Sequence, residues 1–165
     1  VQGPVKTTAI SGLKKKVTLA KGKSLTLQPQ LYPKDSEDKI TYTSSNRTIA
    51  SVNSKGVVKA KKAGSTNITV KSGNVKAVVK LQVPKVKTKK LLGIPKKVNL
   101  KAGKKYKMKI TAVPKNTDDK ISYKSSNKKV ATVSTRGVIK GKKRGTTVIT
   151  VSSGKYKRKC KVTVK

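Results

Sequence analysis

The chain lacks most of the residues on which enzymes depend. Its 165 residues include no histidine, tryptophan or phenylalanine, one cysteine and five acidic residues. Histidine is the commonest general base and a frequent metal ligand, and a single cysteine can form neither an internal disulfide nor a multi-sulfur metal site. No apolar run approaches the roughly 18 residues that would cross a bilayer. The composition therefore predicts no catalysis, no cofactor and no membrane insertion.

Positive charge dominates what the sequence does contain. Lysine and arginine number 43 against five acidic residues, which gives a net charge of +38. Residues 1–86 carry 17 bases and 3 acids, whereas residues 87–165 carry 26 bases and 2 acids. Charges at this density repel one another on folding and attract polyanions. The charge is therefore evidence about partners and not about the fold.

One unit of sequence occurs twice. The stretch Ile40–Val70 returns as Ile121–Val151, at an offset of 81 residues, and no gap is needed anywhere in the alignment. Between Lys6–Pro84 and Lys87–Lys165, 35 of 79 positions are identical. Such a repeat predicts two modules, residues 1–84 and 85–165. Modules of this size have thin cores and need tight packing.

The hydrophobic pattern has a period of two. It is clear in Ser24–Leu31, which we predict to be a half-buried strand, and in Val75–Val83. In the second copy, Tyr106 and Met108 continue the inward row of the first of these strands. Turn residues recur every eight to twelve positions, as in Asn53–Gly56, and no helical period of 3.6 is present. The pattern predicts an all-β sandwich in each module.

The motifs of the repeat resemble those of a known family. Ser44-Ser45-Asn46 is followed at fixed spacings by Ile-Ala-Ser-Val, Gly-Val-Val and Ile-Thr-Val, and the second copy keeps the same order. This pattern is similar to that of the bacterial immunoglobulin-like domain, group 2, found in invasin- and intimin-type adhesins. The resemblance covers nearly all of both repeats. It implies two tandem Ig-like β-sandwich domains that act as a spacer, stalk or accessory module and contain no catalytic residues.

The resemblance also bears on localisation. It implies an extracellular or cell-surface bacterial protein. The chain begins with Val1 and not with methionine, and no signal-peptide pattern follows. We therefore expect a fragment of a larger protein. Members of the family often have tryptophan before the Ser-Ser-Asn motif, where this chain has Tyr42 and Tyr123; we expect both tyrosines to remain in the core.

Two features have alternative interpretations. Clustered carboxylates at Asp35, Glu37 and Asp38, echoed by Asp118 and Asp119, are the ligands that calcium prefers. Flanking lysines favour a solvated loop that offsets local repulsion, and the calcium hypothesis stays open. Cys160 lies on the apolar face of the last predicted strand. This position favours a small buried hydrophobic residue over a reactive thiol.

The lysines provide the candidate binding site. The densest groups lie in the second module and form the predicted polyanion-binding set: Lys105, Lys107, Lys109, Lys140, Lys142, Lys143, Arg144, Lys157, Lys159 and Lys161. In an Ig-like sandwich the strands around Lys105–Lys109 and Lys157–Lys161 belong to opposite sheets. The set should therefore form a positive coat and not a single groove.

The excess of lysine over arginine indicates which class of anionic partner the chain can bind. All but four of the 43 basic residues are lysines, which lack the planar fork that arginine uses to bind phosphate in two places. A diffuse polymer, such as cell-wall teichoic acid or acidic polysaccharide, fits this chemistry best. The sequence thus predicts a non-catalytic spacer that adheres to an acidic polymer. The alternatives are a plain spacer without a ligand and non-specific binding of nucleic acid, and the oligomeric state stays undetermined.

Overall fold

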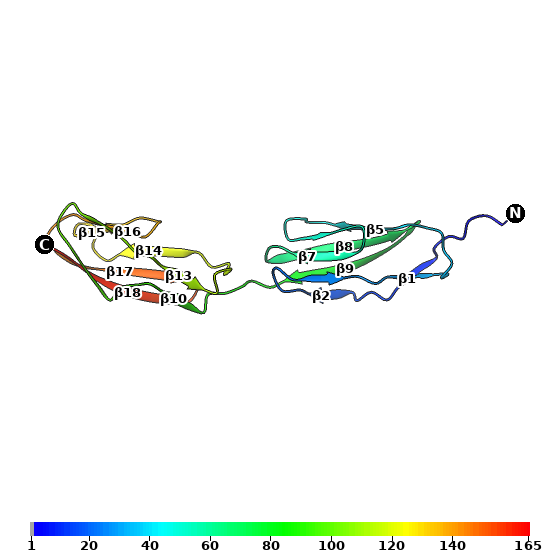
Figure 1. The fold of residues 1–165 in the computed structure, drawn as a ribbon, viewed down its shortest axis with the longest axis horizontal. Helices are drawn as coiled ribbons and strands as arrows, with labels where there is room; N and C mark the ends of the chain where they lie inside the picture. Colours follow the sequence, from blue (N-terminus) through cyan, green and yellow to red (C-terminus); the bar gives the residue numbers. More distant parts are fainter. Residues whose placement is uncertain (1) are drawn as a thin grey trace. The chain divides into compact units, whose positions relative to one another are not determined.

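A computed structural model describes residues 2–165, which form 18 β-strands and no helix (Figure 1). Contacts divide the chain into one unit that ends at Lys85 and a second that begins at Val86. Val86 belongs to the second unit because its N–H donates to Asp118 Oδ2 at 2.7 Å, and the Asp118 N–H donates to the Val86 carbonyl, also at 2.7 Å. Each unit, or module, contributes nine strands.

Module 1 is a sandwich of two main sheets and a small third sheet. The first main sheet has the order β2-β9-β8-β5, the second has the order β3-β7-β6, and β1 pairs with β4. All of these pairs are antiparallel except β2 with β9, which is parallel. The strands are β1 (Ala9–Ser11), β2 (Lys16–Thr18), β3 (Ser24–Thr26), β4 (Gln30–Tyr32), β5 (Ile40–Ser44), β6 (Ala50–Val52), β7 (Val57–Ala60), β8 (Gly64–Ser72) and β9 (Val75–Val83).

Module 2 repeats this topology strand for strand. Its sheets have the orders β11-β18-β17-β14, β12-β16-β15 and β10-β13, and β11 is parallel to β18. The strands are β10 (Lys90–Leu92), β11 (Lys97–Leu100), β12 (Lys105–Lys107), β13 (Thr111–Val113), β14 (Ile121–Ser125), β15 (Ala131–Val133), β16 (Val138–Gly141), β17 (Gly145–Ser153) and β18 (Tyr156–Val164). The predicted all-β fold, with two tandem Ig-like sandwiches, is confirmed.

The core of each module lies between its two main sheets. In module 1 the long strands β8 and β9 lie side by side (Figure 1) and turn alternate side chains inward. Ile68 and Val70 on β8 and Leu81 on β9 are at most 1% exposed, and Val58 on β7 meets them from the other sheet. Because strand side chains alternate between faces, the residues between these lie on the outside.

Tyr42 and Tyr123 pack against these cores, partly buried, and burial raises the pKa of both hydroxyl groups. Each ring also covers a turn glycine. Gly56 has φ of +75°, and a Cβ at that position would lie 2.9 Å from the Tyr42 ring. Gly137 stands in the same relation to Tyr123, at φ of +74°. A glycine is required at this turn for two reasons, the positive φ and the close approach of the ring.

Two details differ from the sequence-based expectation. The segment Ser24–Leu31 is not one strand but two, because β3 pairs with β7 and β4 pairs with β1. Module 2 splits in the same way with Ile110 in place of Pro29, so proline is not the cause; the chain changes sheets here. Tyr106, predicted to face inward, is 38% exposed because the short edge strand β12 is exposed along its whole length.

The incoming segment of each module is anchored by an aspartate. The Thr7 N–H donates to Asp38 Oδ2 at 2.7 Å, and the Thr7 hydroxyl lies 2.8 Å from the buried Ser72 hydroxyl. In module 2 the Thr88 N–H donates to Asp119 Oδ2 at 2.7 Å. The Asp38 side chain is only 10% exposed, so the predicted solvated loop does not describe this residue. Its carboxylate fastens the lead-in segment to the module body.

The Asp38 anchor predicts a pH dependence of stability. The Thr7 N–H, and to a lesser degree the charge of Lys6 at 3.4 Å, lower the pKa of Asp38 from its ordinary value of 3.8. A lowered pKa in the folded state stabilises the fold above the unfolded pKa, and this stabilisation is lost as pH falls through the folded pKa. We therefore expect the urea concentration at the unfolding midpoint of module 1 to decrease when the pH is lowered below about 4. In D38N, a smaller difference between the midpoints at pH 7 and pH 3 is expected; an unchanged difference would contradict the anchor.

Cys160 predicts a second measurable property. The side chain is 0% exposed among the core residues of β17 and β18, and burial raises the pKa of the thiol. A thiol reagent should therefore label the native protein far more slowly than the urea-unfolded protein. Module 1 has Val79 at the equivalent position, so C160V should change the unfolding free energy by less than about 1 kcal/mol. C160S should cost about 1–3 kcal/mol, since it buries a hydroxyl.

Candidate functional site

All ten residues of the predicted polyanion-binding set are exposed. They are distributed over both main sheets of module 2. Lys105 and Lys107 lie on β12, and Lys140 lies on β16 in the same sheet, whereas Lys157, Lys159 and Lys161 lie on β18 in the other sheet. Lys109 follows β12. Lys142, Lys143 and Arg144 form the loop between β16 and β17. The set is thus divided between two surfaces.

The first surface contains a direct lysine pair. Lys105 and Lys140 are register partners across β12 and β16. Residues directly opposite each other in an antiparallel pair have Cβ atoms about 5 Å apart and point to the same face. The two ammonium groups therefore share one face of the sheet, without a carboxylate at either register position. Like charges in this arrangement oppose folding and attract a shared anion.

The second surface contains a row of lysines along β18. Lys157, Lys159 and Lys161 are two residues apart along the strand, so neighbours in the row are about 6.7 Å apart; Cys160 between them is buried, and Arg158 is exposed. Lys97 on β11 is the register partner of Lys161. The predicted set omitted Lys97 because the parallel pairing of β11 with β18 has no local signal in the sequence. Lys97 extends the row sideways across the sheet.

Module 1 has a less charged version of the second surface. Lys16 on β2 pairs with Lys80 on β9, as Lys97 does with Lys161. Val78 occupies the position equivalent to Lys159 and is 53% exposed. The row on β9 is therefore interrupted.

Few carboxylates are available to neutralise this charge. Five acidic residues face 43 basic ones, so one-to-one pairing would leave at least 38 cations without a carboxylate. Asp38, Asp118 and Asp119 also accept backbone N–H groups from the segments that lead into the two modules. Among residues 2–165 no three potential metal-ligating side chains cluster, and no described helix has the length and apolar character needed to span a membrane.

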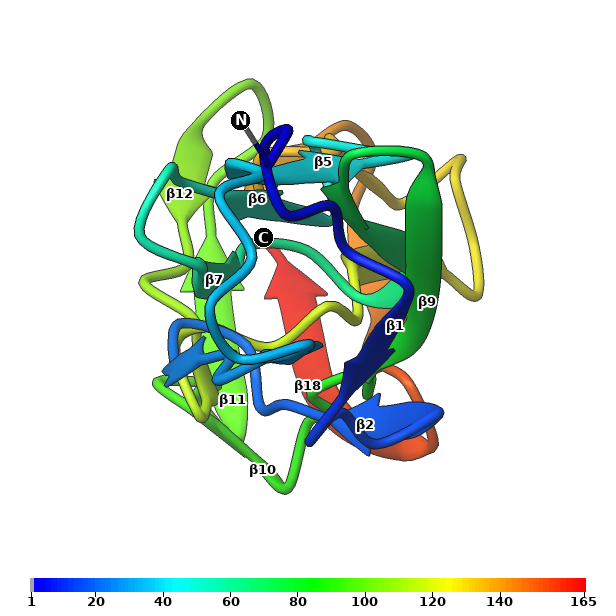
Figure 2. The same cartoon turned by 90° about the vertical axis from the view of Figure 1, so that its right-hand side faces the viewer.

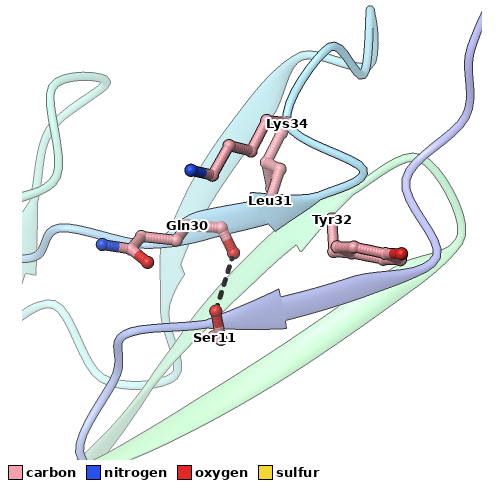
Figure 3. Close-up of a pocket in the computed structure, with 5 residues that line it drawn as sticks. All are labelled: Ser11, Gln30, Leu31, Tyr32 and Lys34. Carbon is pink, nitrogen blue, oxygen red and sulfur yellow. Dashed lines mark hydrogen bonds between the residues drawn. The ribbon is translucent and has the colours of Figure 1, made fainter.

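One aromatic side chain was missed by the sequence reasoning. Tyr42, Tyr106 and Tyr123 are predicted to face inward, whereas no prediction covers Tyr32, which is 67% exposed. It lines an open pocket of about 510 Å³ between β1 and β4, together with Ser11, Gln30, Leu31 and Lys34 (Figure 3). The alternation in Ser24–Leu31 gives a signal for this, because it puts Leu31 on the inward face and its neighbour Tyr32 on the outward face.

The family model of the bacterial Ig-like domain (group 2) matches residues 5–83 and 94–164. The chain belongs to this family. Each module is one bacterial Ig-like domain, and the matched residues of each include its two main sheets.

Individual relatives include proteins of different kinds. A kappa-carrageenase of Pseudoalteromonas carrageenovora is 46% identical over 69 residues, which are 41% of this chain and 17% of the enzyme. Among solved structures, domains 4 and 5 of the S-layer protein SbsC have 23% identity and a TM-score of 0.44 over 76% of each chain. A bacterial Ig-like domain containing GH10 xylanase from termite gut has 24% identity and a TM-score of 0.37, covering 52% of this chain and 24% of the xylanase. The similar segment is thus shorter than either module and is a small part of the curated relative.

The pairing of Lys105 with Lys140 predicts the effect of charge reversal. In K140E the cross-strand pair becomes attractive, so the unfolding free energy of module 2 should rise by about 0.5–1 kcal/mol in low salt. K107E is the control, because it makes the same change in net charge but its register partner is Val138. Denaturant unfolding at 20 mM and 500 mM salt measures the difference. Equal effects of the two substitutions would show that only net charge matters.

Proposed function

We propose that this pair of bacterial Ig-like domains is a non-catalytic module of an extracellular or surface protein, which spaces its parent and adheres electrostatically to an acidic polymer. Cell-wall teichoic acid and acidic polysaccharide are the partners that the chemistry favours. The observation that carries the proposal is the exposure of all ten candidate cations on two sheets of module 2.

The distribution of charge supports a diffuse ligand. A compact anion would need cations that converge on one concave site, whereas the lysine row of β18 and the lysine pair of β12 and β16 lie on different sheets. A long polymer can contact several such surfaces and release counterions at each. Lysine suits this role because it acts as a hydrated point charge without a fixed docking geometry.

The similarity to a kappa-carrageenase supports a polysaccharide as the polymer. One relative is an enzyme named for the polysaccharide carrageenan, and the similar segment is 17% of that enzyme. A module of this kind beside an enzyme that acts on a polymer is consistent with a role in holding the polymer or spacing the enzyme. The catalytic work would then belong to other parts of the parent protein.

A salt titration tests the proposal. Binding of the chain to purified teichoic acid and to polygalacturonate should weaken steeply with ionic strength, and log K should fall linearly with log salt. A chain that binds neither polymer at 20 mM salt would be a plain spacer. Competition that favours double-stranded DNA over both polymers would assign the lysines to nucleic acid instead.

Matched triple variants test whether the coat is delocalised. The variant K140E/K142E/K143E should weaken binding by less than about tenfold, because many other phosphate or carboxylate contacts remain. The variant K59E/K61E/K62E changes the equivalent positions of module 1 by the same charge. A complete loss of binding in the first variant and no loss in the second would show a localised site and contradict a coat.

A further inference from the structure

The pocket beside Tyr32 differs in character from the lysine surfaces. It lies where β1 and β4 form their two-stranded sheet, and β1 also lies next to β9 (Figure 2). Its volume of about 510 Å³ is within the range of sites that hold a small ligand. It combines an aromatic ring, an amide, a hydroxyl and an ammonium group within five residues. Tyr42 and Tyr123 line two smaller pockets, but both of these tyrosines are partly buried.

The polar groups of this pocket are available to a ligand. Among the described residues, the Gln30 amide, the Tyr32 hydroxyl and the Lys34 amine have no hydrogen-bond or ion-pair partner. The Ser11 hydroxyl donates to the Gln30 carbonyl at 3.4 Å, which leaves its oxygen free to accept a bond (Figure 3). Four polar groups can therefore bind without first breaking a strong internal bond.

The arrangement suits a ring that bears both hydroxyl groups and an acid group. In Figure 3 the Lys34 amine and the Gln30 amide lie toward one end of the pocket, and the Tyr32 ring lies toward the other. An exposed tyrosine ring offers a flat apolar face, and a pyranose presents C–H groups of matching shape on one of its faces. The amide and the hydroxyl can pair with sugar hydroxyls, and the ammonium can pair with a carboxylate or sulfate.

We propose that the Tyr32 pocket binds one anionic sugar unit, such as a uronate or a sulfated hexose, of the acidic polymer. The sugar ring lies on Tyr32, its acid group faces Lys34, and its hydroxyl groups contact Gln30 and Ser11. This inference rests on the proposed function and narrows the polymer to an acidic polysaccharide. A nucleic-acid strand fits less well, since single strands are held by successive stacking platforms and this pocket has one ring.

Module 2 provides an internal comparison. The equivalent positions hold Leu92, Thr111, Ala112, Val113 and Lys115. The lysine is kept, but the ring, the amide and the serine hydroxyl are absent. Module 2 also has a pocket at this place, of about 440 Å³, which Thr111, Ala112 and Lys115 help to line. The ring and the amide, and not the hollow itself, are therefore specific to module 1, which carries the smaller share of the positive charge. In this proposal module 1 recognises the sugar unit, and module 2 contributes most of the electrostatic attraction to the polymer.

The first experiment separates ring recognition from charge. Binding of wild type, Y32V and Y106L is measured against polygalacturonate and against inorganic polyphosphate, which is anionic but has no sugar ring. Valine is the residue of module 2 at this position, and Tyr106 is another exposed tyrosine. Y32V should lose about fivefold in affinity for polygalacturonate and nothing for polyphosphate, the size expected of one aromatic contact. Y106L should change neither.

Two further measurements test the same contact. In wild type, the ring signals of Tyr32 in a ¹³C spectrum should shift on titration with trigalacturonate, while those of Tyr106 stay in place. K34Q should weaken binding to polygalacturonate more than K115Q, which removes the same charge from the equivalent position of module 2. Unmoved Tyr32 signals together with equal effects of the two lysine variants would overturn the inference.

The outcomes distinguish the two proposals. No binding to either polyanion at low salt overturns the proposed function itself. Salt-sensitive binding that Y32V leaves unchanged overturns the sugar pocket and leaves the electrostatic adhesion standing. If Y32V instead weakens binding of single-stranded DNA and not of polygalacturonate, the ring stacks on bases and the sugar assignment is wrong.

Discussion

Mutual repulsion among ammonium groups opposes every compact arrangement of this chain, and the alternation of side chains along β-strands makes folding compatible with it. On β18, Lys157, Lys159 and Lys161 face water, where the solvent and dissolved ions screen their charges. Cys160 and Val162, on the opposite face of the strand, are fully buried, whereas Arg158 near the start of the strand is exposed. From Lys159 to Val164 one strand thus carries charged side chains on its outer face and neutral, buried side chains on its inner face.

The few carboxylates of the chain serve architecture more than neutralisation. Asp38 and Asp119 accept backbone N–H groups from Thr7 and Thr88, at the point where the chain enters each module. A side chain on Gly73 would collide with the Asp38 carboxylate, and Gly154 stands in the same relation to Asp119. Lysine could not replace either aspartate, because it has no acceptor for these N–H groups. This chain therefore keeps acidic residues at the positions where the fold requires a hydrogen-bond acceptor.

Much of the fold could be predicted from the sequence because the relevant signals are local. The strand Val75–Val83 and the turn at Gly56 follow from alternation and from turn chemistry, and the internal repeat transfers each assignment to the second module. The split between β3 and β4 could not be predicted in this way. Alternation continues through both strands, and only their partners, which are distant in sequence, distinguish them.

In the candidate site, too, the sequence predicts what depends on local signals and does not predict what depends on strands that are distant in the chain. The exposure of the lysines follows from the cost of burying a charge. The pairing of Lys97 with Lys161 depends on a parallel contact between strands some sixty residues apart, and no local pattern encodes it. Tyr32 was overlooked for another reason: the tyrosines considered were those on inward positions, and the alternation that puts Tyr32 opposite Leu31 was not followed beyond the end of the predicted strand.

The parallel pairing of the entry and exit strands has a mechanical consequence. In module 1, β2 lies near the start of the chain and β9 ends the module, and they run in the same direction. A pull on the two ends of the module draws these strands past each other along their length. All hydrogen bonds between them are then strained together and do not open one after another, the geometry in which a β-sheet resists tension best. The parallel pair β11 and β18 gives module 2 the same shear geometry.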